Sequence, residues 1–406
     1  MRPVYGRSPW VDRFPKSRVP SRPTARGEID TDVVVIGGGL TGCLTAYALA
    51  VAGLRVVVVE ADRVGRGASS AASGWITDTA GQSFIEMEAR LGRRAARHAW
   101  QAWRRAALDL EALIRRLHIR CYLVGAPALL VAHSVEQASQ LARERTERGD
   151  AGIEGSLLTA RTVGPVTGFP ATAALRTRDG AVVDPYRLTL GMAKAAADRG
   201  AVILERSPAT RTRTDRDGVT VDAGGARLRA QRVVVATGEP DPLFPALARH
   251  VVRRTTFQVL TDTVPAKVRR SLGSRDHLIE DRLDPPHRIS WVDDERVLIG
   301  GADSDPVAAK ARPATLVQRT GQLMYELSTF YPEMSGLQPS HGWDVPYVTT
   351  ATGLPLIGPH RNYPRHLFAF GSPSRSLTAS CLASRLLVRQ HLGETQAGDD
   401  IFGFSR

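Results

Sequence analysis

Cysteine is scarce in this chain of 406 residues. Its three cysteines, Cys43, Cys121 and Cys381, lie far apart in the sequence. Disulfide frameworks and cysteine-based metal sites need cysteines in closely spaced groups. The sequence therefore predicts neither, and a reducing, cytoplasmic setting fits this usage best.

Long hydrophobic runs are also missing. No apolar stretch reaches the roughly 18–20 residues that a membrane-spanning helix requires. The N-terminus carries basic residues but no compact apolar segment behind them, so no secretory signal is expected. The sequence predicts a protein without a membrane partner.

Lysine is rare, but positive charge is not. Only four lysines occur, whereas Lys and Arg together number 54 and the net charge is +13. The arginines are spread along the whole chain rather than gathered in one block, which argues against a nucleic-acid-binding surface. The charge indicates either a compositional bias on a solvated surface or a basic field that attracts an anionic substrate.

The length suits two intertwined domains, and a hydrophobic content of 43% allows a large core. Residues 1–29 are rich in Arg, Pro and Ser, which predicts an extended arm rather than a domain. Within this arm, Trp10 and Phe14 are the residues expected to anchor it on the body of the protein.

A strand–turn–helix–strand unit begins after Asp32. Residues 33–36 are a continuous β-branched run, an Ala/Leu-rich helical stretch continues to about residue 53, and residues 55–59 form a second buried strand that ends in Glu60. The glycines between strand and helix are Gly37, Gly39 and Gly42. Gly37 allows a tight turn, Gly39 allows the close approach of a pyrophosphate, and Gly42 allows close packing of the helix on the strand. Glu60 is placed to accept hydrogen bonds from ribose hydroxyls, which predicts a dinucleotide other than NADP.

A run of small residues, 66–74, follows the second strand. Such a run is typical either of a flexible surface loop or of a segment that lies close along an extended ligand. A nicotinamide enzyme of this type would usually continue with a further βα unit at this point. The run therefore favours FAD over NAD.

The rest of the chain alternates helical and strand patterns. Helices are predicted over residues 82–118, 135–148, 184–199, 314–330 and 378–391. Strands are predicted over residues 122–132, 201–205, 209–214, 218–222, 232–236, 251–261, 287–292, 296–301 and 367–370. Residues 174–183 predict a hairpin around Asp179 and Gly180.

Six stretches, taken in their order and spacing, resemble one family. They are VVVIGGGLTG, GRGASSAASGW, VVDPYRL, VVVATG, RVLIGGAD, and TGLPLIGPH followed by LFAFG. On these residues the chain resembles the D-amino-acid oxidase and glycine oxidase (DAO) superfamily of FAD-dependent oxidoreductases over nearly all of residues 30–406.

The resemblance implies an α/β fold: a Rossmann-like FAD-binding domain with a doubly wound sheet, and a second α+β substrate domain with a large mixed sheet. The expected FAD-binding segments are 30–85, 150–172, 184–246 and 340–406. The expected substrate-domain segments are 86–149, 173–183 and 247–339. The implied reaction is hydride transfer from the carbon beside an amine nitrogen to flavin N5. Oxygen or another acceptor would reoxidise the flavin, and the oligomeric state stays open.

The resemblance also implies site residues. The expected FAD contacts are Gly37, Gly39, Leu40, Thr41, Gly42, Glu60, Ala61, Arg66, Gly67, Ser69, Ser70, Ala236, Thr237, Gly238, Gly353, Leu354, Pro355, Gly371, Ser374, Arg375, Leu377 and Thr378. The candidates near the chemistry are Arg375, Tyr347 and His341, although a lone histidine is often structural and Tyr347 or Trp343 can equally be a core aromatic. No cysteine lies near residues 343–352, so non-covalent FAD is expected.

Three departures from the family pattern bear on function. Residues 372–376 read Ser-Pro-Ser-Arg-Ser where glycines usually feed backbone N–H groups to the flavin, and proline has no N–H to donate. Arg375 could replace that positive potential or could be a solvated arginine. Trp291 stands where many members carry a carboxylate-binding arginine, and Thr352 replaces an aspartate.

These departures leave two alternatives to an amine or amino-acid oxidoreductase. The loss of arginine at residue 291 favours a flavin enzyme with a bulkier substrate that is not an amino acid. It also predicts that glycine, sarcosine and D-alanine are poor substrates. The altered loop favours a flavoprotein-like scaffold or partner subunit with impaired catalysis.

Overall fold

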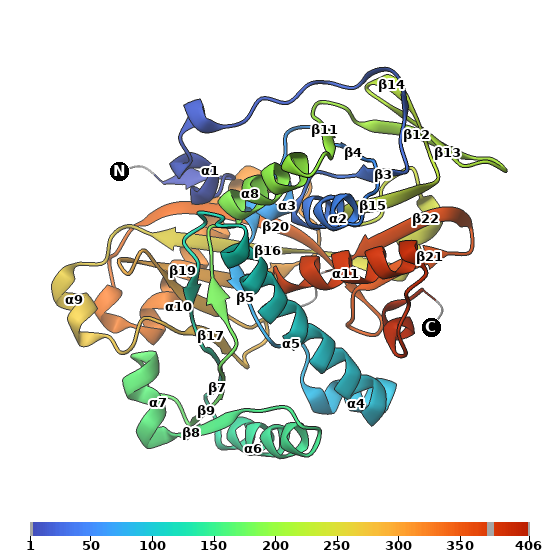
Figure 1. Cartoon of the computed structure of the whole chain (residues 1–406). Coiled ribbons are helices and arrows are strands. Elements are labelled where there is room, and N and C mark those ends of the chain that lie inside the picture. The colour runs from blue at the N-terminus through green and yellow to red at the C-terminus, as the bar shows by residue number, and fades with distance from the viewer. Residues whose placement is uncertain (1–2, 372–376, 405–406) are drawn as a thin grey trace.

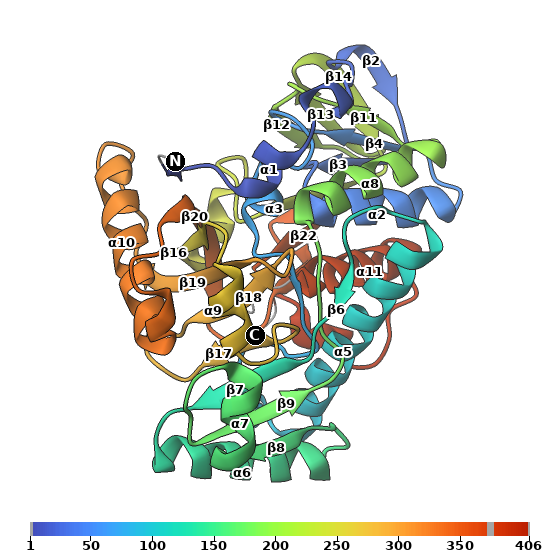
Figure 2. The ribbon, with the colours of Figure 1, turned by 90° about the vertical axis from the view of Figure 1, so that its left-hand side faces the viewer.

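The computed structural model describes residues 3–371 and 377–404. Within these residues the strands form four sheets, of nine, six, four and three strands. Figures 1 and 2 show the ribbon from two directions. No helix in this part of the chain is long and apolar enough to cross a membrane.

The six-stranded sheet contains the two strands around the glycine turn. Its order is β11 (Val202–Leu204), β4 (Val56–Val59), β3 (Val33–Ile36), β15 (Arg232–Gly238), β22 (Tyr363–Phe370) and β21 (Leu356–His360). Only the last pair, β21 with β22, is antiparallel. Every residue of β3 and β4 is buried, as expected for parallel strands covered on both faces.

Different layers cover the two faces of this sheet. One face packs on α2 (Leu40–Val51), α8 (Pro185–Asp198) and α11 (Thr378–Leu392), and α5 (Arg93–Arg116) packs on α11. The other packs on a four-stranded sheet made of β12 (Ala209–Thr214), β13 (Val219–Ala223), β14 (Gly225–Ala230) and β2 (Arg26–Asp30). Val33 and Val35 face the helices, whereas Val34 and Ile36 face the small sheet. The two-residue period of the strand separates them.

The nine-stranded sheet forms the second body of structure. Its order is β1 (Val4–Tyr5), β20 (Pro339–Thr350), β16 (Val251–Thr261), β19 (Arg296–Ser304), β18 (Arg288–Val292), β17 (Leu278–Asp281), β7 (Ala128–Ala132), β9 (Ala173–Thr177) and β8 (Ser156–Thr159). The helix α10 (Arg312–Phe330) packs on one face through Leu316, Leu323 and Leu327. Figure 2 shows α10 on the outer side of this sheet.

The opposite face of the nine-stranded sheet joins the core of the first body. Leu260, Leu298 and Trp343 belong to the same buried cluster as Val33 and Leu44. The two sheets therefore share one hydrophobic core. The predicted α/β fold class, a Rossmann-like sheet with a second domain built on a large mixed sheet, is confirmed. The difference is that a small sheet replaces helices on the second face of the Rossmann-like sheet.

The remaining elements are a small sheet, further helices and 3-10 turns. A three-stranded sheet contains β5 (Trp75–Ile76), β10 (Ala181–Val182) and β6 (Val124–Gly125). The remaining helices are α1 (Pro9–Arg13), α3 (Ala68–Ala71), α4 (Phe84–Leu91), α6 (Val135–Asp150), α7 (Ala160–Thr167) and α9 (Ala266–Ser271). Short 3-10 turns are η1 (Lys16–Arg18), η2 (Pro245–His250), η3 (Pro332–Met334) and η4 (Asp399–Phe402).

Two predicted elements are divided in the structure, and a third does not form. The helix expected over residues 82–118 is two helices, α4 and α5, because Gly92 between them has a φ of 82°. The strand expected over residues 122–132 divides into β6 and β7, which belong to different sheets. The expected hairpin over residues 174–183 does not form, because β9 pairs with β7 and β8 while β10 pairs with β5 and β6.

Candidate cofactor and substrate site

The three glycines of the turn after β3 are required for different reasons. Gly37 has a φ of 108°, and an added Cβ would lie 2.8 Å from the carbonyl oxygen of Ala236. A Cβ on Gly42 would overlap the carbonyl oxygen of Gly37. Gly39 has a φ of −74°, which any residue can adopt, and a Cβ there would meet only Ser69 Oγ, at 3.0 Å. The protein's own packing thus accounts for Gly37 and Gly42, whereas Gly39 leaves a space that suits a ligand.

The start of α2 faces this space. The helix begins after Gly39, which offers no side-chain cap. The backbone N–H of Leu40 donates instead to Ser69 Oγ over 2.9 Å. Free N–H groups and the helix dipole make such an end favourable for phosphate oxygens. Ser69 lies on α3, within the run of small residues, so this run does lie beside the helix start.

Glu60 lies at the mouth of the same turn. Its Oε2 accepts a hydrogen bond from the N–H of Gly38 over 2.6 Å, and its Oε1 accepts one from the N–H of Asp62 over 2.9 Å. The side chain is half-buried at the end of β4. This position, at the carboxyl edge of a parallel sheet beside a glycine turn, suits the recognition of ribose hydroxyls.

Distant segments with predicted FAD contacts meet around this turn. Thr41 Oγ1 lies 2.9 Å from Ser380 Oγ, which joins the start of α2 to the start of α11. The N–H of Gly371 donates to the carbonyl oxygen of Gly238 over 3.1 Å. The N–H of Leu377 donates to the carbonyl oxygen of Trp75 over 2.9 Å.

Other predicted contacts lie at the start of α11, between β20 and β21, and at the end of β22. Thr378 Oγ1 donates to the carbonyl oxygen of Thr77. Leu354 accepts a hydrogen bond from Thr350 Oγ1 through its carbonyl oxygen, and a Cβ on Gly371 would lie 3.6 Å from Pro355 Cα. Gly353 has a φ of 72° and is covered by the side chain of Gln82.

Five further predicted contacts lie close in sequence to Glu60 or to the end of β15. Thr237 Oγ1 donates to the carbonyl oxygen of Glu239, and Ser70 Oγ donates to that of Gly67. The guanidinium of Arg66 lies 6.0 Å from the ring centroid of Tyr186. Ala61 follows Glu60 on an exposed turn. Ser374 and Arg375 lie outside the described residues, so their assignment stays a prediction.

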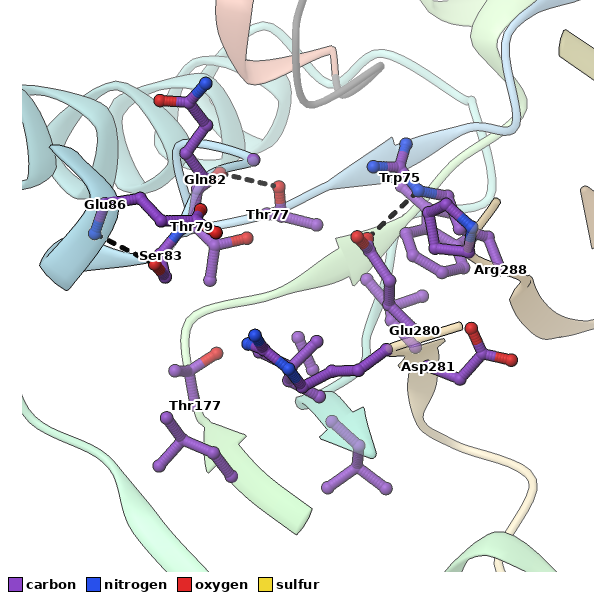
Figure 3. Close-up of a pocket in the computed structure, with 18 of the residues that line it drawn as sticks. Trp75, Thr77, Thr79, Gln82, Ser83, Glu86, Thr177, Glu280, Asp281 and Arg288 are labelled. Atoms are coloured by element: carbon purple, nitrogen blue, oxygen red, sulfur yellow. Dashed lines mark hydrogen bonds and ion pairs between the residues drawn. The ribbon is translucent and has the colours of Figure 1, made fainter. Parts of the chain in front are cut away.

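A cavity of about 240 Å³ adjoins these segments (Figure 3). Its walls come from the chain after β5, from the start of α4, and from β7, β9 and β17 of the large sheet. The lining includes Trp75, Thr77, Gln82, Glu86, Thr177, Glu280 and Arg288. Trp75 and Thr77 also bind Leu377 and Thr378 at the start of α11, and both of these residues are predicted FAD contacts. We call this meeting point the proposed flavin region. It forms one side of the cavity.

Arg288 and Glu280 form the charged pair of this cavity. Arg288 Nε lies 3.0 Å from Glu280 Oε2, and their side chains are 8% and 28% exposed. The Arg288 guanidinium lies 5.8 Å from the ring centroid of Trp75. Figure 3 shows Glu280 pointing toward Arg288, whereas Asp281, the next residue on β17, points the other way.

Arg288 also borders a second, smaller hollow on the face that joins the two bodies. This hollow is lined by Ser73, Trp75, Thr256, Gln258, Arg288, Leu298 and Gly300. Gln258 is 6% exposed. Within the described part of the chain no donor reaches its Oε1 atom. A buried amide oxygen without a donor is costly, so it marks a place where a bound group could supply an N–H or O–H. The space beside Gly39, the start of α2 and the Gln258 Oε1 atom together fit a dinucleotide such as FAD.

Trp291, which stands where the family resemblance places a carboxylate-binding arginine, lines neither the cavity nor the hollow. Trp291 and Ile289 pack in the cluster under α10, and the Arg275 guanidinium lies 5.6 Å from the Trp291 ring. Arg288 and Ser290 point to the opposite face, where Ser290 Oγ accepts a hydrogen bond from Trp75 Nε1 over 2.9 Å. Side chains alternate along β18, so the cavity receives the arginine and the outer core receives the tryptophan.

The two described candidates for chemistry lie elsewhere. Tyr347 donates a hydrogen bond to Asp303 Oδ2 over 2.8 Å. His341 lies 3.5 Å from Asp12 of the N-terminal arm, and burial lowers its pKa. Neither lines the cavity or the hollow. Trp343 is a core residue, 2% exposed. Gln258 and Glu280 were not predicted as site residues from the sequence, because no spacing pattern shows that a polar residue on an internal strand faces a cavity.

Arg148 lines the cavity and belongs to a group of buried charges beside it. Arg148 Nε lies 2.7 Å from Glu144 Oε1, and its guanidinium lies 4.0 Å from the ring centroid of Trp100. Burial lowers the pKa of Arg148. Burial also raises the pKa of Asp78, which accepts a hydrogen bond from Thr177 over 2.7 Å. Each of these charged groups therefore has a partner within the protein.

The sequence matches the family described as "DAO: FAD dependent oxidoreductase" over residues 32–390. Gamma-glutamylputrescine oxidoreductase of Escherichia coli (strain K12) is 28% identical over 383 residues, which are 93% of this chain and 87% of that one. Glycine oxidase of Geobacillus kaustophilus is 27% identical over 398 residues, covering 92% and 96% of the two chains.

The fold has solved counterparts. The crystal structure of glycine oxidase from Geobacillus kaustophilus superposes with a TM-score of 0.77 at 22% identity and covers 93% of this chain and 99% of that one. The agreement extends across both sheets. The family match covers most of the chain and includes the glycine turn, Glu60 and the start of α11. The chain belongs to the DAO family of FAD-dependent oxidoreductases.

Proposed function

We propose that this enzyme oxidises the C–N bond of an amine or amino-acid-like substrate. When bound, FAD supplies the acceptor, at flavin N5, for the hydride that leaves the carbon beside the nitrogen. The substrate is then an imine, which water hydrolyses to a carbonyl compound and an amine or ammonia. The names of the relatives, a glycine oxidase and a gamma-glutamylputrescine oxidoreductase, support this substrate class.

The proposed FAD site follows from the contacts around the glycine turn. Gly37, Gly39, Gly42 and Glu60 would hold the ADP half. The small-residue run around Ser69 would lie along the pyrophosphate, and the segments that meet at Trp75 would border the flavin ring. We propose that binding is non-covalent and that oxygen or another acceptor takes the electrons.

The proposed substrate class rests on Arg288. It is a buried cation on the sheet face that borders the proposed flavin region, and Glu280 and Trp75 hold its guanidinium in place. A guanidinium held in this way binds a carboxylate through paired hydrogen bonds. We therefore assign Arg288 to an anionic group of the substrate. On this proposal, the absence of an arginine at residue 291 would not by itself make simple amino acids poor substrates.

A bulkier substrate is the second candidate. The cavity continues past Arg288 to Glu86 and Thr177, which leaves room for a polar extension beyond an amino-acid core. The alternative of an impaired scaffold rests on residues 372–376, which lie outside the described residues, and it stays a prediction.

We also propose domain limits. The arm is residues 1–29, and the FAD-binding and substrate domains alternate along the rest of the chain. Sheet membership supports moving residues 339–350 and 156–159 to the substrate domain, because β20 and β8 pair within the nine-stranded sheet.

Anaerobic reduction of the bound flavin tests the proposal. The purified holoenzyme is mixed with a panel of glycine, sarcosine, D-alanine, longer amino acids, and amines that lack a carboxylate, and the loss of flavin absorbance is followed. We expect reduction by at least one carboxylated amine. If no amine reduces a flavin that dithionite reduces normally, the proposed reaction is wrong.

A further inference from the structure

Three successive carbonyl groups at the end of α3 each accept a hydrogen bond from a side chain. The donors are Ser8 Oγ to Ser70 over 2.5 Å, Trp343 Nε1 to Ala71 over 2.9 Å, and Trp10 Nε1 to Ala72 over 2.9 Å. The last carbonyls of a helix have no partner within the helix. Here side chains far away in the sequence provide those partners.

The three donor side chains are buried. Ser8, Trp10 and Trp343 are 4%, 5% and 2% exposed. Water therefore has little access to replace a lost donor, and a buried carbonyl left without one carries a desolvation cost. The position of this turn thus depends on these three side chains.

The same short turn contacts the proposed FAD site from its other side. Ser69, next to the first of these carbonyls, accepts the hydrogen bond from Leu40 at the start of α2. It is also the residue that faces the space beside Gly39. A shift of α3 would therefore move Ser69 relative to the helix end that faces the phosphates.

Two of the three donors belong to the N-terminal arm, which is fastened at several points. The N–H of Gly6 donates to the carbonyl oxygen of Gly342 over 2.8 Å, and β1 runs parallel to β20 at the edge of the large sheet. Phe14 packs edge-on against Tyr186 of α8, with ring centroids 5.4 Å apart. Figure 1 shows the arm crossing from α1 to the four-stranded sheet.

The arm precedes the part of the chain that matches the family, which begins at residue 32. The contacts of Ser8 and Trp10 with α3 therefore come from residues outside the segment that the family model matches. They join the edge of the substrate-side sheet, through Gly342 and Trp343, to the turn beside the dinucleotide space.

We propose that Ser8, Trp10 and Trp343 are positioning residues for FAD. They hold the turn of residues 68–72 so that Ser69 and the adjacent backbone lie against the cofactor. The inference rests on the proposed course of FAD along residues 66–70. It adds that the arm contributes to cofactor affinity although it contains no predicted FAD contact.

Substitutions in the full-length chain test this inference. Trp10→Phe removes the N–H donor and keeps an aromatic ring. Trp343→Phe does the same from β20, and Ser8→Ala is a third, smaller change. FAD is removed, and its rebinding to each apoprotein is titrated by the quenching of flavin fluorescence. We expect FAD to bind about tenfold more weakly to each Trp variant, the effect of one lost buried hydrogen bond with its acceptor left unpaired.

Arg13→Ala is the matched control. Arg13 lies on the same helix, α1, but its side chain pairs with Asp293 of the large sheet over 2.6 Å and not with α3. We expect FAD affinity within about twofold of the parent protein, the range of exposed ion pairs. A loss as large as that of Trp10→Phe would mean that any loosening of the arm weakens FAD, and the specific role of the three donors would be overturned.

Thermal unfolding of the apoproteins separates positioning from stability. If Trp10→Phe and Trp343→Phe lower the unfolding temperature but bind FAD as tightly as the parent, the contacts only stabilise the fold and the inference is wrong. Gly39→Val tests the course of FAD itself. If Gly39→Val keeps full affinity, the cofactor does not lie at this turn and the inference fails with that placement. If it loses FAD while the Trp variants do not, only the inference about the arm fails. None of these measurements depends on amine oxidation.

Discussion

Replacing Arg288 tests the substrate assignment most directly. Arg288→Met keeps a side chain of similar length but removes the charge beside Glu280 and Trp75. If Arg288 binds the substrate carboxylate, its loss should cost about 3 kcal/mol of binding, which is about 100-fold in KM for a carboxylated amine. An amine of the same length without the carboxylate should lose much less.

The same change should also affect stability. Removing one partner of a fully buried pair costs about 3–5 kcal/mol, because the remaining charge is uncompensated. Glu280 keeps 28% of its side-chain surface in water, so the expected loss is smaller, about 1–2 kcal/mol. Urea unfolding of Arg288→Met, Glu280→Gln and the double variant measures the coupling of the pair. The double variant should recover part of the loss.

A comparison of two substrates separates carboxylate binding by Arg288 from a general effect on the cavity. Steady-state kinetics with each amine, carboxylated and uncarboxylated, yields KM and kcat for the parent protein and Arg288→Met. Equal increases in KM for both amines would show that the residue only shapes the cavity. An unchanged KM for the carboxylated amine would place the carboxylate elsewhere, with Arg375 as the first candidate.

The remaining predictions concern stability and reactivity. Gly42→Ala should lower the free energy of unfolding by about 2–3 kcal/mol, since its Cβ would overlap the Gly37 carbonyl, and urea unfolding measures this loss. Burial lowers the pKa of His287, but hydrogen bonds to Asp281 and Glu326 outweigh it and the net pKa is raised. Its stabilisation is therefore complete below about pH 6.5, the unfolded value, and is lost as pH rises through the folded pKa. His287→Gln should flatten the fall in unfolding free energy above that pH, and an unchanged profile would contradict the assignment. Burial raises the pKa of all three cysteine thiols to about 12. The folded protein should therefore react slowly with a thiol reagent at pH 8 and the unfolded protein should show three fast-reacting thiols; fast labelling of the folded state would be inconsistent with this burial.

Local pattern was sufficient where the chain interacts mainly with itself over short distances. The strand–glycine–helix unit from residue 33 to Glu60 was predicted in type and order, because a buried β-branched run and a glycine turn leave few other conformations. The helix from Pro185 was predicted for a similar reason, since Asp184 caps it through the N–H of Arg187.

Prediction from local pattern was less accurate where pairing is decided at a distance. The chain does bend at Arg178, but the strands on either side of Asp179 and Gly180 join different sheets. At β18 the two-residue alternation puts Arg288 and Trp291 on opposite faces. It could not say which face meets the proposed flavin region, because the packing of α10 and Trp75 on the two sides decides that.

The sequence by itself thus predicted the family and the cofactor, through six motifs in order along the chain, and the glycine turn, through residues close together in the chain and their backbone conformation. Only the tertiary structure decided that Arg288 and not Trp291 lines the cavity, and that the arm reaches the turn beside Ser69. Both depend on contacts between residues separated by tens to hundreds of positions, and the free energy of those contacts comes from burial and pairing that no local spacing encodes.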